Sequence, residues 1–150
     1  MKETPKEHKI HKNLKAGAMS SSGFLGDDER HYHEIIEDDR VLLRKLGTTT
    51  KHLAERMQYF TEKAFESYDG PVLIDEKFKV FYDSYRGKIL CPFNHSGVFR
   101  KGTITLKNLE NGIEICWTPL NIHMIEEHCF FEGKGSIHRL EPELLFKAIY

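Results

Sequence analysis

The sequence predicts a single α+β domain, in which an N-terminal pair of helices packs on an antiparallel sheet of two hairpins and a short C-terminal helix follows. Two observations lead to this fold class. Apolar residues recur with helical spacing up to about residue 67, and beyond Pro71 they alternate as in a strand. In addition, Asn111-Gly112 separates two alternating segments, which is the strongest short signal for a hairpin.

The length of 150 residues is typical of one domain, and we find neither an internal repeat nor an interdomain linker. Residues 1–22 are predicted to form a flexible basic arm, because they hold five lysines against two glutamates and have almost no apolar periodicity. Residues 23–150 are predicted to form the folded domain.

Composition and charge exclude several classes of protein. The 23 acidic and 22 basic residues nearly cancel, which argues against nucleic acid as a partner. No segment reaches the roughly 18 apolar residues of a membrane span, and the N-terminus has no apolar signal-peptide core. Three cysteines without a signal peptide indicate reduced thiols, so we expect a cytoplasmic protein.

The first helix of the expected pair opens in an acidic segment, residues 27–39, since negative side chains favour the positive end of the helix dipole. Asp39 stands in the middle of the apolar stripe of this helix, so either the helix breaks there or the carboxylate has a defined place. Gly47 is expected to end the helix. A threonine among residues 48–50 is expected to cap the second helix, which ends near Ser67.

This helix pair is also compatible with a helix-turn-helix DNA reader. The acidic first helix would repel phosphates, however, so a plain αα-hairpin is the better interpretation.

The expected sheet consists of two hairpins. The first begins with residues 78–82 and reverses at a turn over residues 85–88, and the second joins residues 103–107 to 113–117 through a type I′ turn at Asn111-Gly112. Two short helices follow the sheet. Asn121 is expected to cap one that reaches Glu127 or His128, and Pro142 is expected to start the last.

The clearest chemical signal joins two separate segments. Cys91 and His95 form a Cys-x3-His pair at a strand end, and the second segment holds His123, Glu127 and His128. Thiolate, imidazole and carboxylate are the usual ligands of zinc. These five residues are therefore the candidate metal ligands, with nearby phenylalanines, Phe93, Phe130 and Phe131, as a dry outer shell.

The spacing within the second segment leaves the ligand set open. His123 and Glu127 share one helix face, whereas His123 and His128 are about 140° apart around the axis. Hence either one histidine ligates, with Glu127 in support, or the helix ends before His128. Without a metal, Cys91 would be a small core residue and the histidines surface residues.

Three classes of function follow from this constellation. A structural zinc site would be saturated by protein ligands, whereas a small metallohydrolase would leave one position to water, with Glu126 or Glu127 as the base. The alternative is a metal-free interaction module, with a second copy of the chain as one conceivable partner in a homodimer.

Two further groups of residues are weaker candidates. The histidines and acids of the first helix, His31, His33, Glu34, Glu37 and Asp38, suit a divalent cation in part, although a solvated helix face is the commoner origin of such a run. The loop of residues 132–136 resembles a phosphate cradle, although a plain turn is the commoner origin of such glycines.

Three segments resemble a family of short bacterial proteins of unknown function. They are residues 86–95, residues 121–128 and residues 131–136, and the resemblance extends over roughly residues 13–150. It implies a bacterial, cytosolic origin and carries no activity, ligand or fold to any residue.

Overall fold

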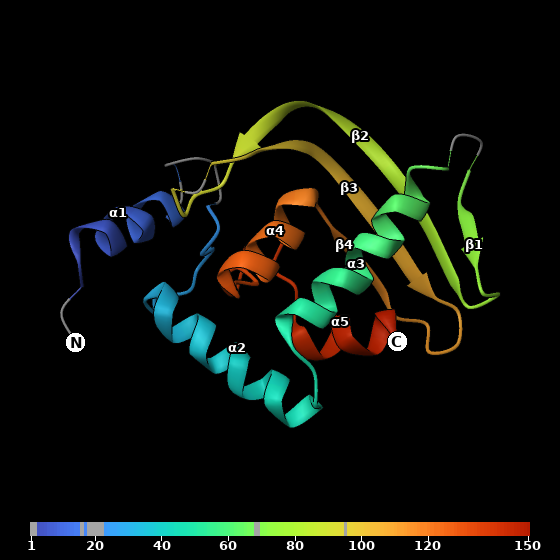
Figure 1. The fold of residues 1–150 in the computed structure, drawn as a ribbon, viewed down its shortest axis with the longest axis horizontal. Coiled ribbons are helices and arrows are strands. Elements are labelled where there is room, and N and C mark those ends of the chain that lie inside the picture. Colours follow the sequence, from blue (N-terminus) through green and yellow to red (C-terminus); the bar gives the residue numbers. More distant parts are fainter. Residues whose placement is uncertain (1–2, 16, 18–22, 68–69, 95) are drawn as a thin grey trace.

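The computed structural model describes residues 3–15, 17, 23–67, 70–94 and 96–150. Within them it has five helices and one antiparallel sheet whose four strands follow one another in chain order, so the predicted α+β class is confirmed (Figure 1). The helices are α1 (Pro5–Leu14), α2 (Tyr32–Leu46), α3 (Thr50–Ala64), α4 (Pro119–His128) and α5 (Pro142–Ile149), and the strands are β1 (Val72–Ile74), β2 (Phe78–Leu90), β3 (Val98–Asn108) and β4 (Glu114–Trp117). In these residues no helix combines the length and apolar character needed to cross a membrane.

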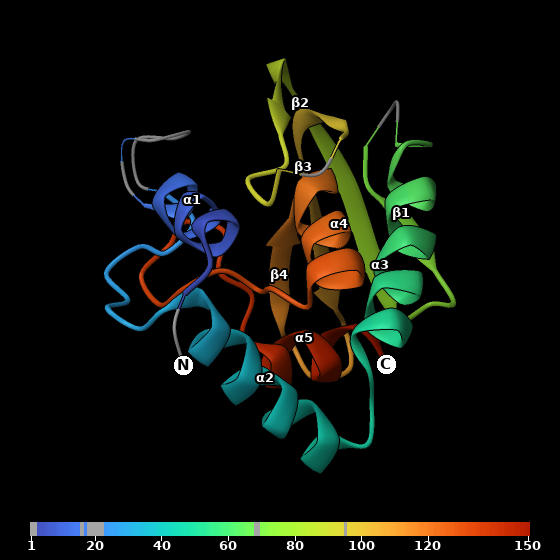
Figure 2. The same ribbon diagram turned by 60° about the vertical axis from the view of Figure 1, so that its left-hand side comes forward.

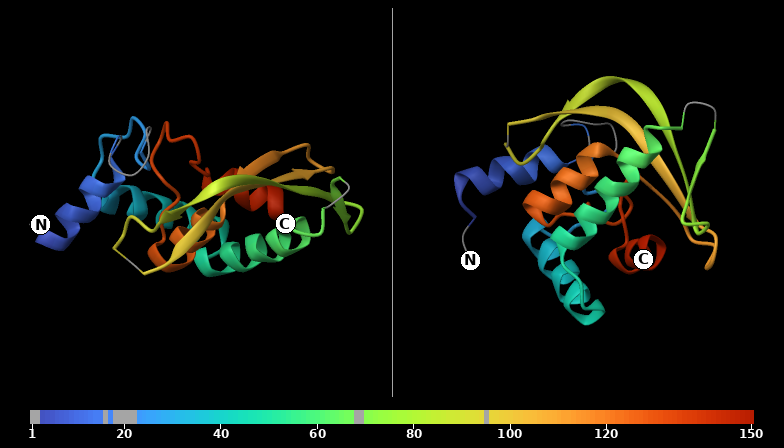
Figure 3. Two further views of the ribbon diagram at one scale, coloured as in Figure 1. Left: turned by 90° about the horizontal axis from the view of Figure 1, so that it is seen from above. Right: turned by 45° about the vertical axis from the view of Figure 1, so that its right-hand side comes forward.

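The long strands β2 and β3 arch over α3 and α4, which lie side by side beneath them (Figures 1 and 3). Helix α5 closes the end of this layer and contacts α2 (Figure 2). Trp117 of β4 is fully buried in the core between sheet and helices. Its indole N–H donates to the hydroxyl of Thr61, which itself donates to the Met57 carbonyl, so the buried polar atoms are satisfied.

The end of α2 and the start of α3 lie where the glycine and threonine signals in the sequence predicted them. Gly47 ends α2 in the left-handed conformation with a φ of 74°, and Thr49 caps α3 by accepting from the His52 N–H. Helix α4 begins three residues earlier than expected. Thr118 is its N-cap, and Asn121 returns the hydrogen bond to the Thr118 N–H as the other half of a capping box.

The predicted turn at residues 85–88 is wrong. β2 continues through it as one strand, and its pairing with β3 changes register between Ser84 and Lys88. Gly87, at a φ of 98°, lies inside this bulge. A glycine within an alternating segment suits a bulge as well as a turn, and here the partner strand β3 is long enough to pair on both sides of it.

The hairpin between β3 and β4 is confirmed, but its turn is not of type I′. Only Gly112 has a positive φ, whereas a type I′ turn needs two such residues. The Asn108 carboxamide oxygen accepts from the N–H groups of Glu110 and Asn111 and holds a longer loop instead. Two consecutive left-handed residues occur between β1 and β2, at Asp75 and Glu76.

The expected basic arm contains a helix that the sequence analysis did not predict. Thr4 caps α1, and Ile10 and Leu14 are buried one turn apart while the lysines face solvent. The Asn13 carboxamide donates to the carbonyl of Pro92, 79 residues further along the chain. Two apolar residues in one helix are too weak a signal to detect against five lysines, yet they form the buried face on which α1 docks.

Asp39 has a defined partner, and α2 passes through it unbroken. Its carboxylate forms a bidentate ion pair with the Arg139 guanidinium, with N–O distances of 2.6 and 2.9 Å. Both side chains are only 7% exposed, and the guanidinium also donates to the Glu132 carbonyl. The bond to a residue 100 positions away explains why an acid interrupts the apolar stripe of the helix.

We expect Asp39→Asn to lower the free energy of unfolding by about 3–5 kcal/mol, because it removes the buried counterion of Arg139 and leaves only the exposed Glu141 carboxylate, 3.2 Å from Nε. Urea unfolding followed by circular dichroism measures this. The control is Glu143→Gln, which breaks the exposed pair with Lys147 and should cost less than about 1 kcal/mol. Similar losses in both variants would show that the Asp39 pair contributes no more than a surface contact.

Candidate metal centre

Three of the predicted ligands come together beneath the sheet. Cys91 follows the last residue of β2, and His123 and His128 belong to α4, over which β2 passes. One ligand atom from each of the three lies within 4.8 Å of the other two. Cys91 is buried and both histidines are partly buried.

The separation of two of these atoms suits a tetrahedral ion. The Cys91 sulfur and the His128 Nε2 are 3.5 Å apart. A zinc ion about 2.3 Å from a sulfur and about 2.0 Å from a nitrogen, at tetrahedral angles, separates the two by about 3.5 Å. The thiol and imidazole therefore stand at a zinc-ligand separation without any movement of the chain.

The expectation that an intact helix keeps His123 and His128 apart is wrong. Helix α4 includes His128 as its last residue, and Cys129 ends it in the left-handed conformation. The two imidazole rings nevertheless lie 5.3 Å apart between centroids, at 77° to one another. Positions about 140° apart around a helix axis therefore still allow two imidazole rings to meet on one side of it.

Glu127, also a predicted ligand, is not in this group. Glu127 is exposed, as is Glu126, because helical geometry turns both away from the buried side of α4. His95 lies outside the described residues. Of the remaining cysteines, Cys116 is exposed on β4, and the Cys129 sulfur lies 3.7 Å from the Thr50 hydroxyl.

Aromatic rings pack around the two imidazoles as expected for Phe93 and Phe130. Phe93 stacks on His128 at 4.3 Å between centroids, with ring planes only 5° apart. Phe99 lies 4.6 Å from His123, and Phe130 packs edge-on against Phe93. Phe131 belongs to the other hydrophobic cluster, around Trp117. These contacts fix the imidazole orientations and reduce the access of water to the cluster.

The second group of histidines holds α1 in place. His31 Nε2 lies 2.5 Å from the Glu3 carboxylate, and His33 Nε2 lies 2.6 Å from Glu7. The hydrogen bond from His31 holds the pKa of Glu3 below its ordinary value. These histidines therefore have carboxylate partners just before α1 and in its first turn, a segment in which the sequence predicted no structure.

The glycines of the loop at 132–136 serve close backbone packing. A Cβ on Gly133 would lie 2.3 Å from the Leu25 carbonyl oxygen, and the Gly133 N–H donates to the Phe24 carbonyl. The polar side chains of this loop are bonded to one another. The Ser136 hydroxyl donates to Glu132 at 2.6 Å, so the plain-turn interpretation describes the loop better than a phosphate cradle does.

Glu132 is a buried acid that sequence reasoning missed. It is 3% exposed, adopts a positive φ of 71°, and accepts from Ser136 and from the Asn121 carboxamide. Burial raises the pKa of its carboxyl to about 7. Its position directly after the buried pair Phe130-Phe131 was the one signal of burial in the sequence.

Comparisons with known proteins add no assignment. A scan against protein-family models, a search of curated proteins and a search of solved structures each found no match. The chemical interpretation therefore depends on the side-chain geometry alone.

We expect Glu132 to make stability fall as pH rises. Its folded pKa of about 7 exceeds the ordinary 4.5, so between these values the unfolded chain releases the proton and the folded chain keeps it. This group should lower the unfolding free energy by about 1.4 kcal/mol per pH unit in that window. Urea unfolding across pH measures it, and Glu132→Gln should remove this slope. A slope unchanged in the variant would contradict the assignment.

Proposed function

We propose that this protein is a zinc-binding domain whose ion is held by Cys91, His123 and His128, with His95 as the fourth ligand. The observation that carries the proposal is the convergence of a thiol and two imidazoles, from segments more than 30 residues apart, within 4.8 Å. The 3.5 Å between the Cys91 sulfur and the His128 nitrogen, a distance also typical of a thiol–imidazole hydrogen bond, fits two ligands of one zinc ion. His95 enters on its spacing from Cys91 alone.

The role we propose for the ion is structural. It would tie the chain that leaves β2 to the end of α4 and so fix the β2–β3 connection on the helix layer. Cys91 is buried, and aromatic rings pack on both imidazoles, as in a site closed by protein ligands. Since Glu126 and Glu127 are exposed, the hydrolase alternative has no base beside the cluster among the described residues. A zinc thiolate also fits the reducing, cytoplasmic location that we propose.

Metal content tests this proposal. Protein purified without chelator should hold about one equivalent of zinc, and Cys91→Ser should lose it, because removing one of four ligands from a closed site removes most of the affinity. Cys116→Ser is the matched control, since Cys116 is exposed on β4 and should leave the zinc in place. Elemental analysis measures the content, and a chelator should lower the melting temperature of the parent but not of Cys91→Ser.

Folded parent protein that carries no zinc and takes up none from solution would show that the proposal is wrong. Cobalt substitution separates the two metal roles. A closed site gives a tetrahedral cobalt spectrum that added azide leaves unchanged, whereas a shift on adding azide would indicate an open position and favour the hydrolase.

A further inference from the structure

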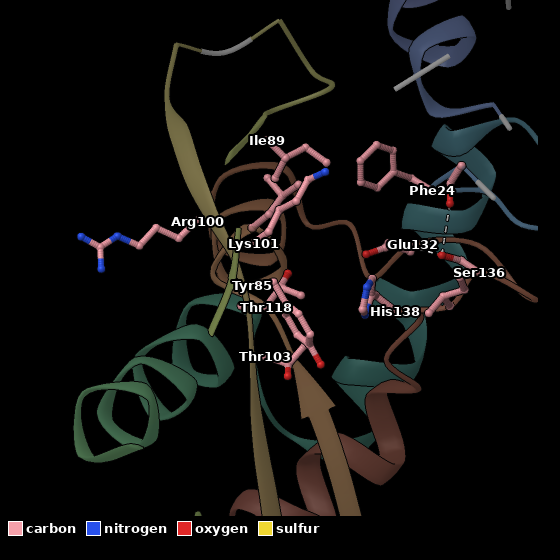
Figure 4. A pocket seen from close by; sticks show the side chains of 14 residues that line it. Phe24, Tyr85, Ile89, Arg100, Lys101, Thr103, Thr118, Glu132, Ser136 and His138 are labelled. Atoms are coloured by element: carbon pink, nitrogen blue, oxygen red, sulfur yellow. Dashed lines mark hydrogen bonds between the residues drawn. The ribbon is translucent and has the colours of Figure 1, made fainter. Parts of the chain in front are cut away.

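A cavity of about 480 Å³ lies between the β2–β3 arch, the start of α4 and the loop of residues 132–138 (Figure 4). Its size falls within the range of small-molecule sites, about 300–1,000 Å³. Cys91, His123 and His128 are not among the residues that line it, so it is separate from the candidate metal centre.

Two backbone features shape the roof of this cavity. The bulge in β2 between Ser84 and Lys88 increases the local twist and bends the strand. Opposite it, Gly102 of β3 is buried, and a Cβ there would lie 2.3 Å from the Tyr82 hydroxyl. Only glycine therefore lets the Tyr82 ring lie across β3. The curvature that opens the cavity is thus built into the strands themselves.

One wall of the cavity carries Glu132 and His138. Glu132 is held by the Ser136 hydroxyl and the Asn121 carboxamide, one on each carboxyl oxygen, and Arg139 donates to its carbonyl. The ionised carboxylate has about four acceptor positions, so two remain for a ligand when Glu132 is deprotonated. The left-handed backbone of Glu132, uncommon for a residue other than glycine, is a strained conformation of the kind that clusters at binding sites. Burial lowers the pKa of His138, which keeps this imidazole neutral.

The facing wall is cationic and apolar. Lys101 of β3 extends along the arch toward the side of the cavity occupied by Phe24, whereas Arg100 points away from it (Figure 4). Between the two walls lie apolar side chains, Phe24, Ile89 and Leu120. The cavity therefore offers a positive charge at one side, a hydrogen-bonding carboxyl at the other and apolar contact between them.

We propose that this cavity binds a small organic acid that carries a carboxylate at one end and a hydroxyl donor at the other. The carboxylate would pair with Lys101, the hydroxyl would donate to Glu132, and the apolar body would lie against Phe24 and Ile89. This inference does not depend on the zinc proposal, since the two sites use different residues.

Three matched probes test the inference, namely 3-(4-hydroxyphenyl)propionate, 3-phenylpropionate and 4-ethylphenol. The first carries both polar groups, the second lacks the hydroxyl and the third lacks the carboxylate. Titrations followed by ¹H–¹⁵N NMR should show the strongest binding for the first probe, at the amides of Phe24, Tyr85 and His138. Loss of either polar group should weaken binding about tenfold.

Variants of the lining residues test which side of the cavity binds each polar group of the probe. Lys101→Met should weaken the binding of both carboxylate probes about tenfold and leave the affinity for 4-ethylphenol unchanged. The matched control is Lys107→Met, on an exposed position of β3 outside the cavity, which should leave all three affinities unchanged. Glu132→Gln should weaken the binding of the two phenol probes and leave the affinity for 3-phenylpropionate unchanged. Absence of shifts at the cavity amides with every probe, or equal effects of Lys101→Met and Lys107→Met, would overturn the proposal.

Discussion

The buried ion pair between Asp39 and Arg139 is the interaction on which the arrangement of the helices depends. It fastens α2 to the loop before α5, and the same guanidinium holds the carbonyl of Glu132. The Glu132 side chain in turn holds Asn121, which is half of the capping box at the start of α4. Hydrogen bonds therefore run from α2 to the helix that carries the candidate metal ligands. Every group in this hydrogen-bonded series has a partner, and these bonds offset the cost of removing the groups from water. Loss of one group leaves its neighbours buried without a partner, at the full desolvation cost.

Helix α4 lies between two hydrophobic clusters and contributes to both. Ile122 and Ile125 pack in the larger one, around Trp117 and the sheet, while Leu120 and Met124 pack in the smaller one, around Phe93. Cys91 belongs to the smaller cluster, which α1 and the start of α2 complete. A small cluster buries less apolar area, so bonds to an ion would add stability where apolar packing supplies least of it.

Sequence reasoning succeeded where the cause is local. Gly47 and Pro142 mark helix ends through their backbone preferences and Thr49 does so through its hydroxyl, and the structure has them at those places. Sequence reasoning failed where a residue far away in the sequence determines the local structure. The bulge around Gly87 exists because β3 pairs on both sides of it, and Asp39 is buried because Arg139 meets it. At the candidate metal site, the residue types were visible in the sequence, but the choice between Glu127 and His128 depended on which of them faces Cys91 in the folded chain.

The separation of Asp39 from Arg139 also orders events during synthesis of the chain. The two residues are 100 positions apart, so at about 5–20 residues per second Asp39 waits about 5–20 s for its partner. Throughout that time α2 carries an unpaired acid within its apolar stripe and cannot settle into its final place. The β2–β3 hairpin, whose strands adjoin in sequence, can pair well before then. A ribosome-bound chain would thus present a formed β2–β3 hairpin while α2 is still undocked.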